Sequence, residues 1–315
     1  MSKALLKVEG LKKYFPIRKG VLNSHTGDVK AVDDVSFEVF EGETLGIVGE
    51  SGCGKSTTGR LLMRLLEPTG GRIEFAGKMI SELSNNEMRK ARRDIQMIFQ
   101  DPFSSLNPKK RVKDIIAEPL RNAYKLSKEE EKKRVYELLE QVGLSAASIY
   151  KYPHEFSGGQ LQRIGIARAI ALNPKLIIAD EPVSALDVSI QAQVLNFMQD
   201  IQKELNLTYL IISHDLGVIK HMSDHIGVMY KGRFIEQGLA DEVFENPQHI
   251  YTKRLISAIP DINPQNREEQ IKIRQKIQKE YKDSYDYYFN TDGLARELVK
   301  ISETHTAAIP KKGSK

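Results

Sequence analysis

The chain has 315 residues, of which 40% are hydrophobic and 28% charged, and its 47 basic and 42 acidic side chains leave a formal net charge of +5. This ordinary globular composition excludes a collagen-like or low-complexity chain. No run of about 18 apolar residues is present, which excludes a membrane-spanning helix, and the single cysteine excludes an intramolecular disulfide framework. So small a basic excess requires neither a membrane surface nor a nucleic acid as partner.

The first part of the chain predicts strands around one helix. Apolar residues alternate with polar ones over 35–39, which is typical of a strand with one buried face. A continuous apolar run over 44–48 predicts a buried strand. Leucines at 61–66 share one face of a helix, which the turn formers at 68–71 should end. Another strand is expected over 72–76.

The middle of the chain is highly charged and mostly helical in pattern, from about 85 to 144. Ser127 is a plausible N-cap for one of its helices. Apolar runs at 176–179 and 209–212 predict buried strands, and a helix with apolar residues three and four apart over 190–205 lies between them.

Residues 228–235, with Lys231-Gly232 at their centre, predict a hairpin. Together these elements indicate an α/β protein with a largely parallel sheet and an inserted helical region. From about residue 263 the chain is rich in Lys, Gln and Glu and then in tyrosine over 281–289. We expect the last few residues to be disordered.

A phosphate-binding loop is indicated at residues 49–56, which read GESGCGKS and match the glycine-rich phosphate-loop pattern completely. A predicted strand precedes the loop and a predicted helix follows it, as this motif requires. Glycines let successive N–H groups face anionic oxygens, and the helix N-terminus adds partial positive charge. Lys55 is then expected to bind the β- and γ-phosphates of a nucleotide, and the Ser56 hydroxyl is expected to bind Mg²⁺.

A pair of carboxylates follows the strand predicted at 176–179. Asp180 is placed where phosphate-loop enzymes hold Mg²⁺. Glu181 should point in a different direction, where it can orient and deprotonate the attacking water. His214 follows the strand predicted at 209–212 and is a candidate to hydrogen-bond the γ-phosphate or the water, because parallel sheets bind ligands at this end of their strands.

The segment FSGGQLQR at 156–163 resembles the signature motif of ATP-binding-cassette (ABC) ATPases. Its Ser157 and two glycines open a second helical pattern, whose N-terminus suits a phosphate. In the family these donors act on the ATP held by the other subunit, so that two ATP molecules are enclosed in a head-to-tail dimer. The motifs also follow one another as in the family: the phosphate loop, Gln100, the signature, Asp180-Glu181, the segment SALD at 184–187, and His214.

The resemblance covers residues from about 6 to 260 and implies a fold. We expect an ABC ATPase domain over 1–260, with a P-loop NTPase (RecA-like) core, an antiparallel β subdomain and a helical subdomain inserted at about 101–160. A small C-terminal extension of the oligopeptide-transporter type is expected over 261–315.

The resemblance also implies roles for further residues. Gln100 matches the glutamine that contacts Mg²⁺ and the attacking water, and Asp187 ends a loop that crosses the dimer interface. Tyr14 or Phe15 matches the aromatic that stacks on adenine, and the sequence does not decide between them. The predicted catalytic residues are Glu181, His214 and Gln100, and the predicted Mg²⁺ ligands are Ser56, Gln100 and Asp180. The predicted ATP contacts are Phe15, Tyr14, Gly49, Glu50, Ser51, Gly52, Cys53, Gly54, Lys55, Ser56, Thr57, Ser157, Gly158, Gly159, Gln160 and Asp187.

Three segments resemble the oligopeptide and dipeptide importer branch: the long loop over 15–32, QDPFSSLNP at 100–108, and NPQHIYT at 246–252. Gln160 is similar to the second, F-type ATPase of such systems. The implied protein is a peripheral ATP-hydrolysing subunit on the cytoplasmic face of the cell membrane. Its implied partners are a second cassette ATPase, expected to be a different chain, two integral membrane permease subunits and an extracytoplasmic peptide-binding protein, with no nucleic acid.

The chain also departs from this branch. Many members carry a cysteine-rich C-terminal segment that can bind an iron–sulfur cluster, but Cys53 is the only cysteine here. The aromatic run over 285–289 is interpreted either as a patch against the neighbouring ATPase or as a surface helix.

Other functions remain open. An ABC ATPase could serve another transporter, for nickel or for peptide export. Soluble DNA-repair and ribosome-associated proteins also contain cassettes, although they usually carry two cassettes or long coiled-coil or zinc insertions.

Overall fold

The structure is a computed structural model that describes residues 3–19, 24–259 and 267–310, and the chain divides into two compact units. Unit 1 consists of Met1–Leu6, Val39–Glu43 and Glu74–Ile212, and unit 2 of Lys7–Glu38, Thr44–Ile73 and Ser213–Lys315. Strands and helices occur in both units, so the predicted α/β class is confirmed. The expectation for the last few residues falls on 311–315, outside the described part of the chain.

The sheet of unit 1 is parallel. Strand β7 (Leu176–Asp180) lies between β6 (Ile95–Ile98) and β8 (Thr208–Ser213). All residues of β7 and β8 are buried, which explains why both strands are continuous apolar runs in the sequence instead of alternating ones. Because the strands are parallel, the residues that follow β6 and those that follow β7 lie at the same edge of the sheet.

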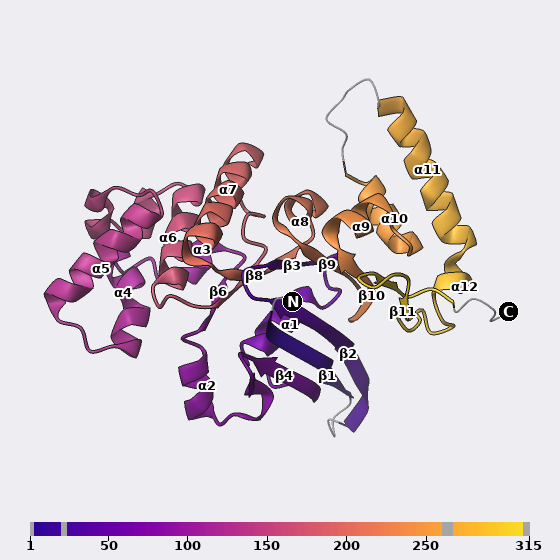
Figure 1. Cartoon of the computed structure of the whole chain (residues 1–315), viewed down its shortest axis with the longest axis horizontal. Helices are drawn as coiled ribbons and strands as arrows, with labels where there is room; N and C mark the ends of the chain where they lie inside the picture. Colours follow the sequence, from indigo (N-terminus) through magenta and orange to yellow (C-terminus); the bar gives the residue numbers. More distant parts are fainter. Residues whose placement is uncertain (1–2, 20–23, 260–266, 311–315) are drawn as a thin grey trace. The chain divides into compact units, whose positions relative to one another are not determined.

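The predicted helical segment of unit 1 consists of α3 (Pro102–Ser105), α4 (Val112–Ala123) and α5 (Lys128–Gln141), and α6 (Gly158–Ile170) packs against all three (Figure 1). Ser127 caps α5 as predicted: its Oγ accepts the N–H of Glu130 at 3.2 Å, and the Glu130 carboxylate accepts the N–H of Ser127 at 2.8 Å. The buried face of α5 consists of Val135, Leu138 and Leu139.

The other elements of unit 1 are short, apart from α7 (Val188–Leu205), which confirms the helix predicted at 190–205. It buries Val194, Met198 and Ile201 and ends at Asn206 in the left-handed conformation. Among the described helices, none is both long and apolar enough to cross a membrane. The short elements are β5 (Lys78–Met79), α2 (Asn85–Ala91) and the 3-10 helices Ile80–Glu82, Ala146–Tyr150 and Pro153–Glu155.

The main sheet of unit 2 combines both strand directions. Strand β3 (Thr44–Val48) runs parallel to β9 (His225–Tyr230), and β9 is antiparallel to β10 (Arg233–Leu239). The predicted hairpin turn joins β9 and β10, with positive φ at both Lys231 and Gly232. Further along the sheet come strands from near the C-terminus, β12 (Thr306–Ala307) beside β10 and β11 (Val299–Lys300) beside β12.

Unit 2 also contains α1 (Lys55–Leu62), α8 (Leu216–Met222), α9 (Ala240–Glu245), α10 (Ile250–Ser257), α11 (Arg267–Asp283) and α12 (Tyr285–Tyr288). Helix α8 contacts β3, α9 contacts β9 and β10, and α10 packs along α11. In Figure 1 the α10–α11 pair and α12 are the orange-to-yellow helices.

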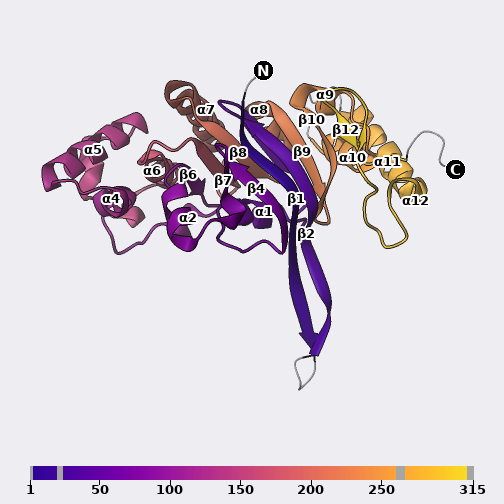
Figure 2. The ribbon, with the colours of Figure 1, turned by 60° about the horizontal axis from the view of Figure 1, so that its bottom comes forward.

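The segment over 15–32 is not the expected long loop. Two long strands, β1 (Ala4–Lys19) and β2 (Ser24–Phe40), run side by side and project as a narrow ribbon (Figure 2). Strand β4 (Gly70–Phe75) lies on the other side of β1. The outer part of the ribbon is mostly exposed on both faces, so its sequence lacks the alternation that indicates a strand.

Helix α1 ends earlier than predicted. It stops at Leu62, and Arg64 has a positive φ of 47°. The N–H of Leu65 donates to the carbonyl of Arg60 at 2.9 Å and that of Arg64 donates to Leu61 at 2.9 Å, which is the pattern of a Schellman C-cap. Leu65 is consequently 49% exposed instead of sharing the buried face of Leu61 and Leu62.

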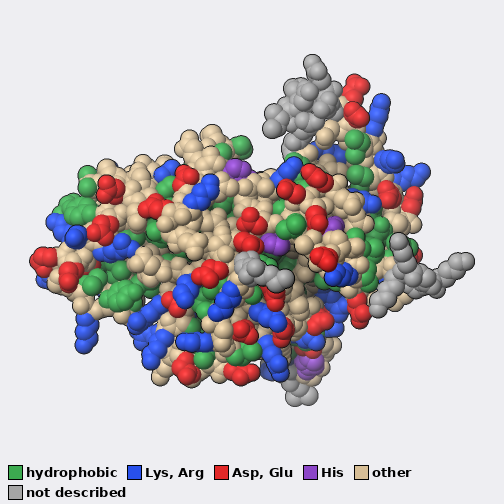
Figure 3. Space-filling model, in the orientation of Figure 1, with side chains coloured by type: hydrophobic (Ala, Val, Ile, Leu, Met, Phe, Trp, Pro, Cys, Tyr) green, Lys and Arg blue, Asp and Glu red, His purple; other side chains and the backbone are tan. Residues whose placement is uncertain are grey.

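The aromatic run over 285–289 is partly buried and partly at the surface, where Tyr287 is 55% exposed. Phe289 is buried, with its ring centroid 4.9 Å from Tyr230 and 5.3 Å from His249, so the end of this run packs against its own unit. Basic and acidic side chains are interspersed over the face shown in Figure 3, as expected for nearly equal numbers of each.

Candidate functional site

The phosphate loop of unit 2 joins the buried strand β3 to helix α1, as predicted. Its shape requires glycine at its two ends. A Cβ at Gly49 would lie 2.2 Å from the carbonyl oxygen of Met229, and a Cβ at Gly54 would lie 2.2 Å from that of Ala31. Gly54 also has a φ of 113°, which L side chains rarely adopt. The loop is therefore enclosed by the backbone of β2 and β9, and this packing determines its course.

The charge of Lys55 is already held inside the loop. Its side chain is buried, and its Nζ donates to the carbonyl oxygens of Gly49 at 2.7 Å and Glu50 at 3.0 Å. Thr58 adds a bond from its Oγ1 to the carbonyl of Gly54 at 3.1 Å. A full positive charge beside the start of a helix is a suitable site for nucleotide phosphates.

Cys53 has little access to solvent. It is 6% exposed, and its carbonyl accepts the N–H of Gly232 at 2.8 Å. Desolvation raises the pKa of its thiol, and the nearby charge of Lys55 only partly opposes this effect. Its backbone, and not its sulfur, is thus the part suited to contact a phosphate.

Tyr14 and Phe15 differ in their surroundings. The Tyr14 hydroxyl hydrogen-bonds the Asp33 carboxylate, which raises the pKa of Tyr14 to about 12. Asp33 is buried and also accepts two hydrogen bonds from Arg233, at 2.6 and 2.8 Å. Phe15 is 38% exposed, and the ammonium of Lys13 lies near its ring face, 5.1 Å from the centroid. Phe15 is therefore better placed to stack on a base, and Tyr14 has a structural partner.

The carboxylate pair of unit 1 lies at the carboxyl end of β7. Asp180 is 3% exposed and is the last residue of the strand. Glu181 has a φ of 51°, and its N–H donates to the carbonyl of Ile212 at 2.8 Å. This left-handed conformation takes the chain out of the strand direction directly after Asp180.

Gln100 follows the neighbouring strand β6 after one residue. Ile98 is opposite Ala179 in the parallel register, so Gln100 and Asp180 follow strand ends at the same edge of the sheet. Gln100 is exposed. His214 directly follows β8, is also exposed, and precedes Asp215, the N-cap of α8.

The signature segment forms the N-terminus of α6. The Ser157 Oγ accepts the N–H of Gln160 at 3.4 Å, and the Gln160 Oε1 accepts the N–H of Ser157 at 3.1 Å, which is a capping box. Both residues are exposed. The start of this 13-residue helix is thus held in place by its own side chains and faces solvent.

The glycines of the signature permit close packing on the segment that precedes and opens α7. A Cβ at Gly158 would lie 3.0 Å from Leu186, and a Cβ at Gly159 would lie 2.5 Å from the Cγ2 of Ile190. Asp187 is the N-cap residue of α7, and the side chain of Gln191 donates to the carbonyl of Leu186 at 2.9 Å. The signature and the predicted interface loop at 184–187 therefore form one packed group within unit 1.

The predicted site residues fall into two groups. Unit 1 gathers the signature with the 184–187 loop, and it places Gln100 and the carboxylate pair at one sheet edge. Unit 2 holds the phosphate loop, the two aromatic residues on β1 and His214.

Sequence reasoning missed the side chains that support the phosphate loop and the aromatics. Arg233 holds Asp33, which in turn holds Tyr14, and Tyr251 and Arg254 contact Glu50. Arg233 is 200 positions from Asp33, and Tyr251 and Arg254 are 201 and 204 positions from Glu50, so no local pattern indicated these contacts.

The predicted donors fit a nucleotide with Mg²⁺. Ser56, Gln100 and Asp180 each supply an oxygen, which is the ligand type that Mg²⁺ prefers. In the described ranges, no group of three or more His, Cys, Asp or Glu side chains is placed to hold a metal ion. A Mg²⁺ ion bound mainly through phosphate and water oxygens does not need such a group.

Two family descriptions match the chain. The family described as ABC transporter matches residues 32–184, and the one described as oligopeptide/dipeptide transporter, C-terminal region, matches residues 235–288.

Curated relatives match 82% to 98% of the chain. It is 53% identical over 309 residues to the oligopeptide transport ATP-binding protein OppF of Lactococcus lactis subsp. lactis (strain IL1403), covering 98% of this chain and 97% of that protein. It is 58% identical over 260 residues to the oligopeptide transport ATP-binding protein AppF of Bacillus subtilis (strain 168), covering 82% and 79%. It is 51% identical over 269 residues to the dipeptide transport ATP-binding protein DppF of Haemophilus influenzae, covering 85% and 82%.

Solved structures share the fold. The ATP-binding cassette MJ0796, in a dimeric post-hydrolysis state bound to ADP and Pi, matches with a TM-score of 0.66 and 29% identity, over 75% of this chain and 98% of that chain. The cbiO1 protein of Clostridium perfringens, part of the ABC transporter complex cbiONQ, also matches with a TM-score of 0.66, at 31% identity over 80% and 95%.

Proposed function

Because the chain belongs to the ABC transporter family, as an ATP-binding subunit of the oligopeptide/dipeptide importer type, we propose that it hydrolyses ATP to power the import of oligopeptides. The observation that carries this proposal is a complete phosphate loop with the Lys55 charge inside it, in a chain that also matches the C-terminal region of peptide transporters over 235–288. The alternatives of another cargo or of a soluble DNA-repair or ribosome-associated protein are not favoured, since the relatives named above are peptide-transport proteins.

In the proposed reaction, Lys55 and the N–H groups of the loop bind the β- and γ-phosphates of ATP. Glu181 orients the attacking water and accepts its proton, while Gln100 and His214 hydrogen-bond the water and the γ-phosphate. Ser56, Asp180 and Gln100 would hold Mg²⁺, which when bound neutralises phosphate charge. Phe15 stacks on the adenine, supported by its exposed ring.

The proposed active form is a head-to-tail dimer with a second cassette ATPase, expected to be a different chain. The exposed, capped N-terminus of α6 supports this proposal, because its N–H groups suit the phosphate of a nucleotide bound elsewhere. The dimer would dock as a peripheral protein on the cytoplasmic face of two permease subunits, which receive peptides from an extracytoplasmic binding protein.

Isolation of the native assembly tests the function. The chain is tagged in its own cell, membranes are solubilised in mild detergent, and the proteins recovered in near-equal amounts are identified. We expect two multi-spanning proteins, a second cassette ATPase and a peptide-binding protein. A soluble complex with DNA or ribosomes and no membrane protein would contradict the proposal, and a metal-binding partner in place of the peptide-binding protein would change the cargo.

A further inference from the structure

A side chain of helix α10 hydrogen-bonds the backbone at the start of the phosphate loop. The N–H of Glu50 donates to the Tyr251 hydroxyl at 3.2 Å. Tyr251 is fully buried, and its ring lies against Tyr230, with centroids 4.8 Å apart. The hydroxyl therefore has a fixed position, and it meets the loop at the residue directly after Gly49.

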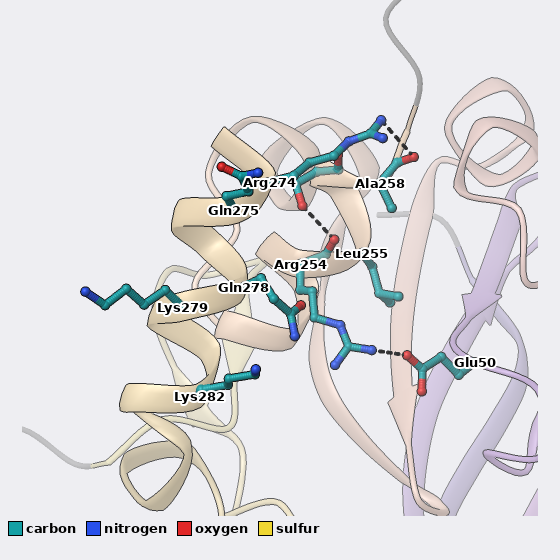
Figure 4. A pocket seen from close by; sticks show the side chains of 10 residues that line it. Glu50, Arg254, Leu255, Ala258, Arg274, Gln275, Gln278, Lys279 and Lys282 are labelled. Carbon is teal, nitrogen blue, oxygen red and sulfur yellow. Dashed lines mark hydrogen bonds and ion pairs between the residues drawn. The ribbon is translucent and has the colours of Figure 1, made fainter. Parts of the chain in front are cut away.

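A second residue of α10 holds the Glu50 side chain. Arg254 pairs with the Glu50 carboxylate (Figure 4). The guanidinium of Arg254 also lies over two rings, 5.5 Å from the centroid of Tyr251 and 4.7 Å from that of Tyr281. Tyr281 belongs to α11, so this one arginine connects the C-terminal extension to the phosphate loop.

The start of α10 is itself anchored to the sheet of unit 2. His249 is the N-cap, and its Nδ1 accepts the N–H of Tyr251 at 3.1 Å. The buried carboxylate of Glu236, on β10, accepts the N–H groups of Gln248 at 2.6 Å and His249 at 3.0 Å. Glu236 is also bound to His305, next to β12, at 2.8 Å. These hydrogen bonds fix the start of α10, the helix that contacts the loop.

From these contacts we infer that Tyr251 and Arg254 are positioning residues for ATP, through which the C-terminal extension sets the affinity of the phosphate loop for nucleotide. Phosphate binding needs several loop N–H groups aimed at one place, and a loop fixed in that arrangement before ATP arrives loses less conformational freedom on binding. Both residues bond Glu50, at the start of the loop. They act through Glu50.

The two contacts should respond differently to salt. The Tyr251 bond is buried and uncharged, whereas the side chains of Arg254 and Glu50 are 29% and 51% exposed. A cavity of about 640 Å³ opens beside this pair, lined by Arg254, Glu50 and residues of α11 such as Gln278 and Lys282 (Figure 4). Mobile ions can therefore screen the ion pair, and they leave the Tyr251 hydrogen bond unaffected.

The first test is Tyr251→Phe in the full chain, which removes the hydroxyl and keeps the ring. We expect the Kd for a fluorescent ATP analogue with Mg²⁺ to rise roughly 3- to 10-fold, the range that one lost hydrogen bond gives. In the assembled transporter KM for ATP should rise by a similar factor, while kcat stays within about twofold because Tyr251 does not touch the reacting atoms.

The matched control is Tyr288→Phe. Tyr288 belongs to the same aromatic cluster and packs on His249, at 4.8 Å between ring centroids, whereas the bond to the Glu50 N–H is made by Tyr251. Equal Kd values for the two tyrosine variants would overturn the role of Tyr251. So would a fall in kcat without a change in KM.

The ion pair is tested with Arg254→Gln, Arg254→Lys and the control Lys279→Gln. Lys279 also lines the cavity, but its side chain points away from Glu50 in Figure 4. We expect Arg254→Gln to raise Kd about 2- to 5-fold at low salt and to have little effect at 0.5 M NaCl, with partial recovery in Arg254→Lys. Glu50→Gln should raise Kd as much as Arg254→Gln does, and the double variant should show no further rise, because both changes remove the same ion pair. An effect of Lys279→Gln as large as that of Arg254→Gln, or one that persists at high salt, would contradict the inference.

Discussion

At the scale of single residues, Glu181 combines a buried carboxylate with an unusual backbone. It is 8% exposed and has a φ of 51°, a conformation that costs free energy in a residue other than glycine. The turn is held by the N–H bond from Glu181 to Ile212 and by two bonds from Ser184 to the Glu181 carbonyl. A strained backbone conformation at a buried carboxylate is consistent with the proposed role of Glu181 as general base.

Replacing Glu181 with glutamine keeps the size and polarity of the side chain and removes the base. We expect Glu181→Gln to bind ATP with unchanged affinity and to hydrolyse it at least about 100-fold more slowly, because a general base contributes that much or more. ATPase assays of the assembled transporter and nucleotide binding to the chain measure both effects. Glu204→Gln, at an exposed position near the end of α7, is the control. Turnover near that of the unaltered protein would refute the role.

Cys53 is expected to react slowly with alkylating reagents. Burial raises its thiol pKa, so a smaller fraction is thiolate at pH 8 than in an exposed cysteine, and the thiolate is the nucleophile. Mass spectrometry after iodoacetamide treatment should show slow labelling at pH 8, faster labelling as the pH is raised, and complete labelling in denaturant. Labelling of the folded chain at the rate of a free thiol would contradict the burial of Cys53.

At the scale of elements, the close packing of α6 on α7 depends on the absence of a side chain at Gly159. Gly159→Ala would place a Cβ 2.5 Å from Ile190, which forces the two helix starts apart. We expect a loss of about 1–3 kcal/mol in the free energy of unfolding and lower ATPase activity, because the signature and the 184–187 loop move together. Urea unfolding and ATPase assays measure the two effects.

The same helix offers a matched control. A Cβ at Gly165 meets nothing within 4 Å, so Gly165→Ala should be neutral or stabilising by up to about 1 kcal/mol through helix propensity. Ile190→Ala should restore part of the activity of Gly159→Ala by removing the clash. If Gly159→Ala and Gly165→Ala behave alike, the packing argument is wrong.

At the scale of the whole molecule, the C-terminal region of unit 2 adds two strands to a sheet, β12 beside β10 and β11 beside β12. Its interior contains a polar group formed by Glu236, His305 and His249, all buried. Burial lowers the pKa of His249 to about 3 from an ordinary value of 6.5. The neutral ring is required, because its Nδ1 accepts the N–H of Tyr251.

This histidine makes stability depend on pH. The unfolded chain takes up a proton at His249 below about pH 6.5, which the folded chain excludes until about pH 3. The neutral His249 therefore contributes its full stabilisation to the folded state above pH 6.5. As the pH falls from 7 to 5, this effect lowers the free energy of unfolding by about 2 kcal/mol. Urea unfolding at the two pH values should show a smaller loss for His249→Asn, which keeps an N-cap acceptor, and an unchanged loss for the exposed His221→Asn. Equal losses in both variants would contradict this assignment.

Several elements could be predicted from the few residues that form them. The phosphate loop, the signature capping box, the Ser127 cap, the Lys231-Gly232 turn and the buried strands were all predictable, because each depends on backbone conformation or burial over a short span. The exposed ribbon of β1 and β2 was not predictable in this way, since strands open to solvent on both faces carry no alternation.

Only the tertiary structure decided which distant residues support the site. Tyr14 bonds Asp33, which Arg233 holds from 200 positions away, and Phe15 keeps the exposed ring. Tyr251 and Arg254 reach Glu50 from about 200 positions away. Such contacts depend on how strands and helices pack, and the local sequence around one residue does not indicate its distant partner. The chain's own sequence therefore determined its family and its phosphate-binding chemistry, whereas packing determined what holds the phosphate loop in place.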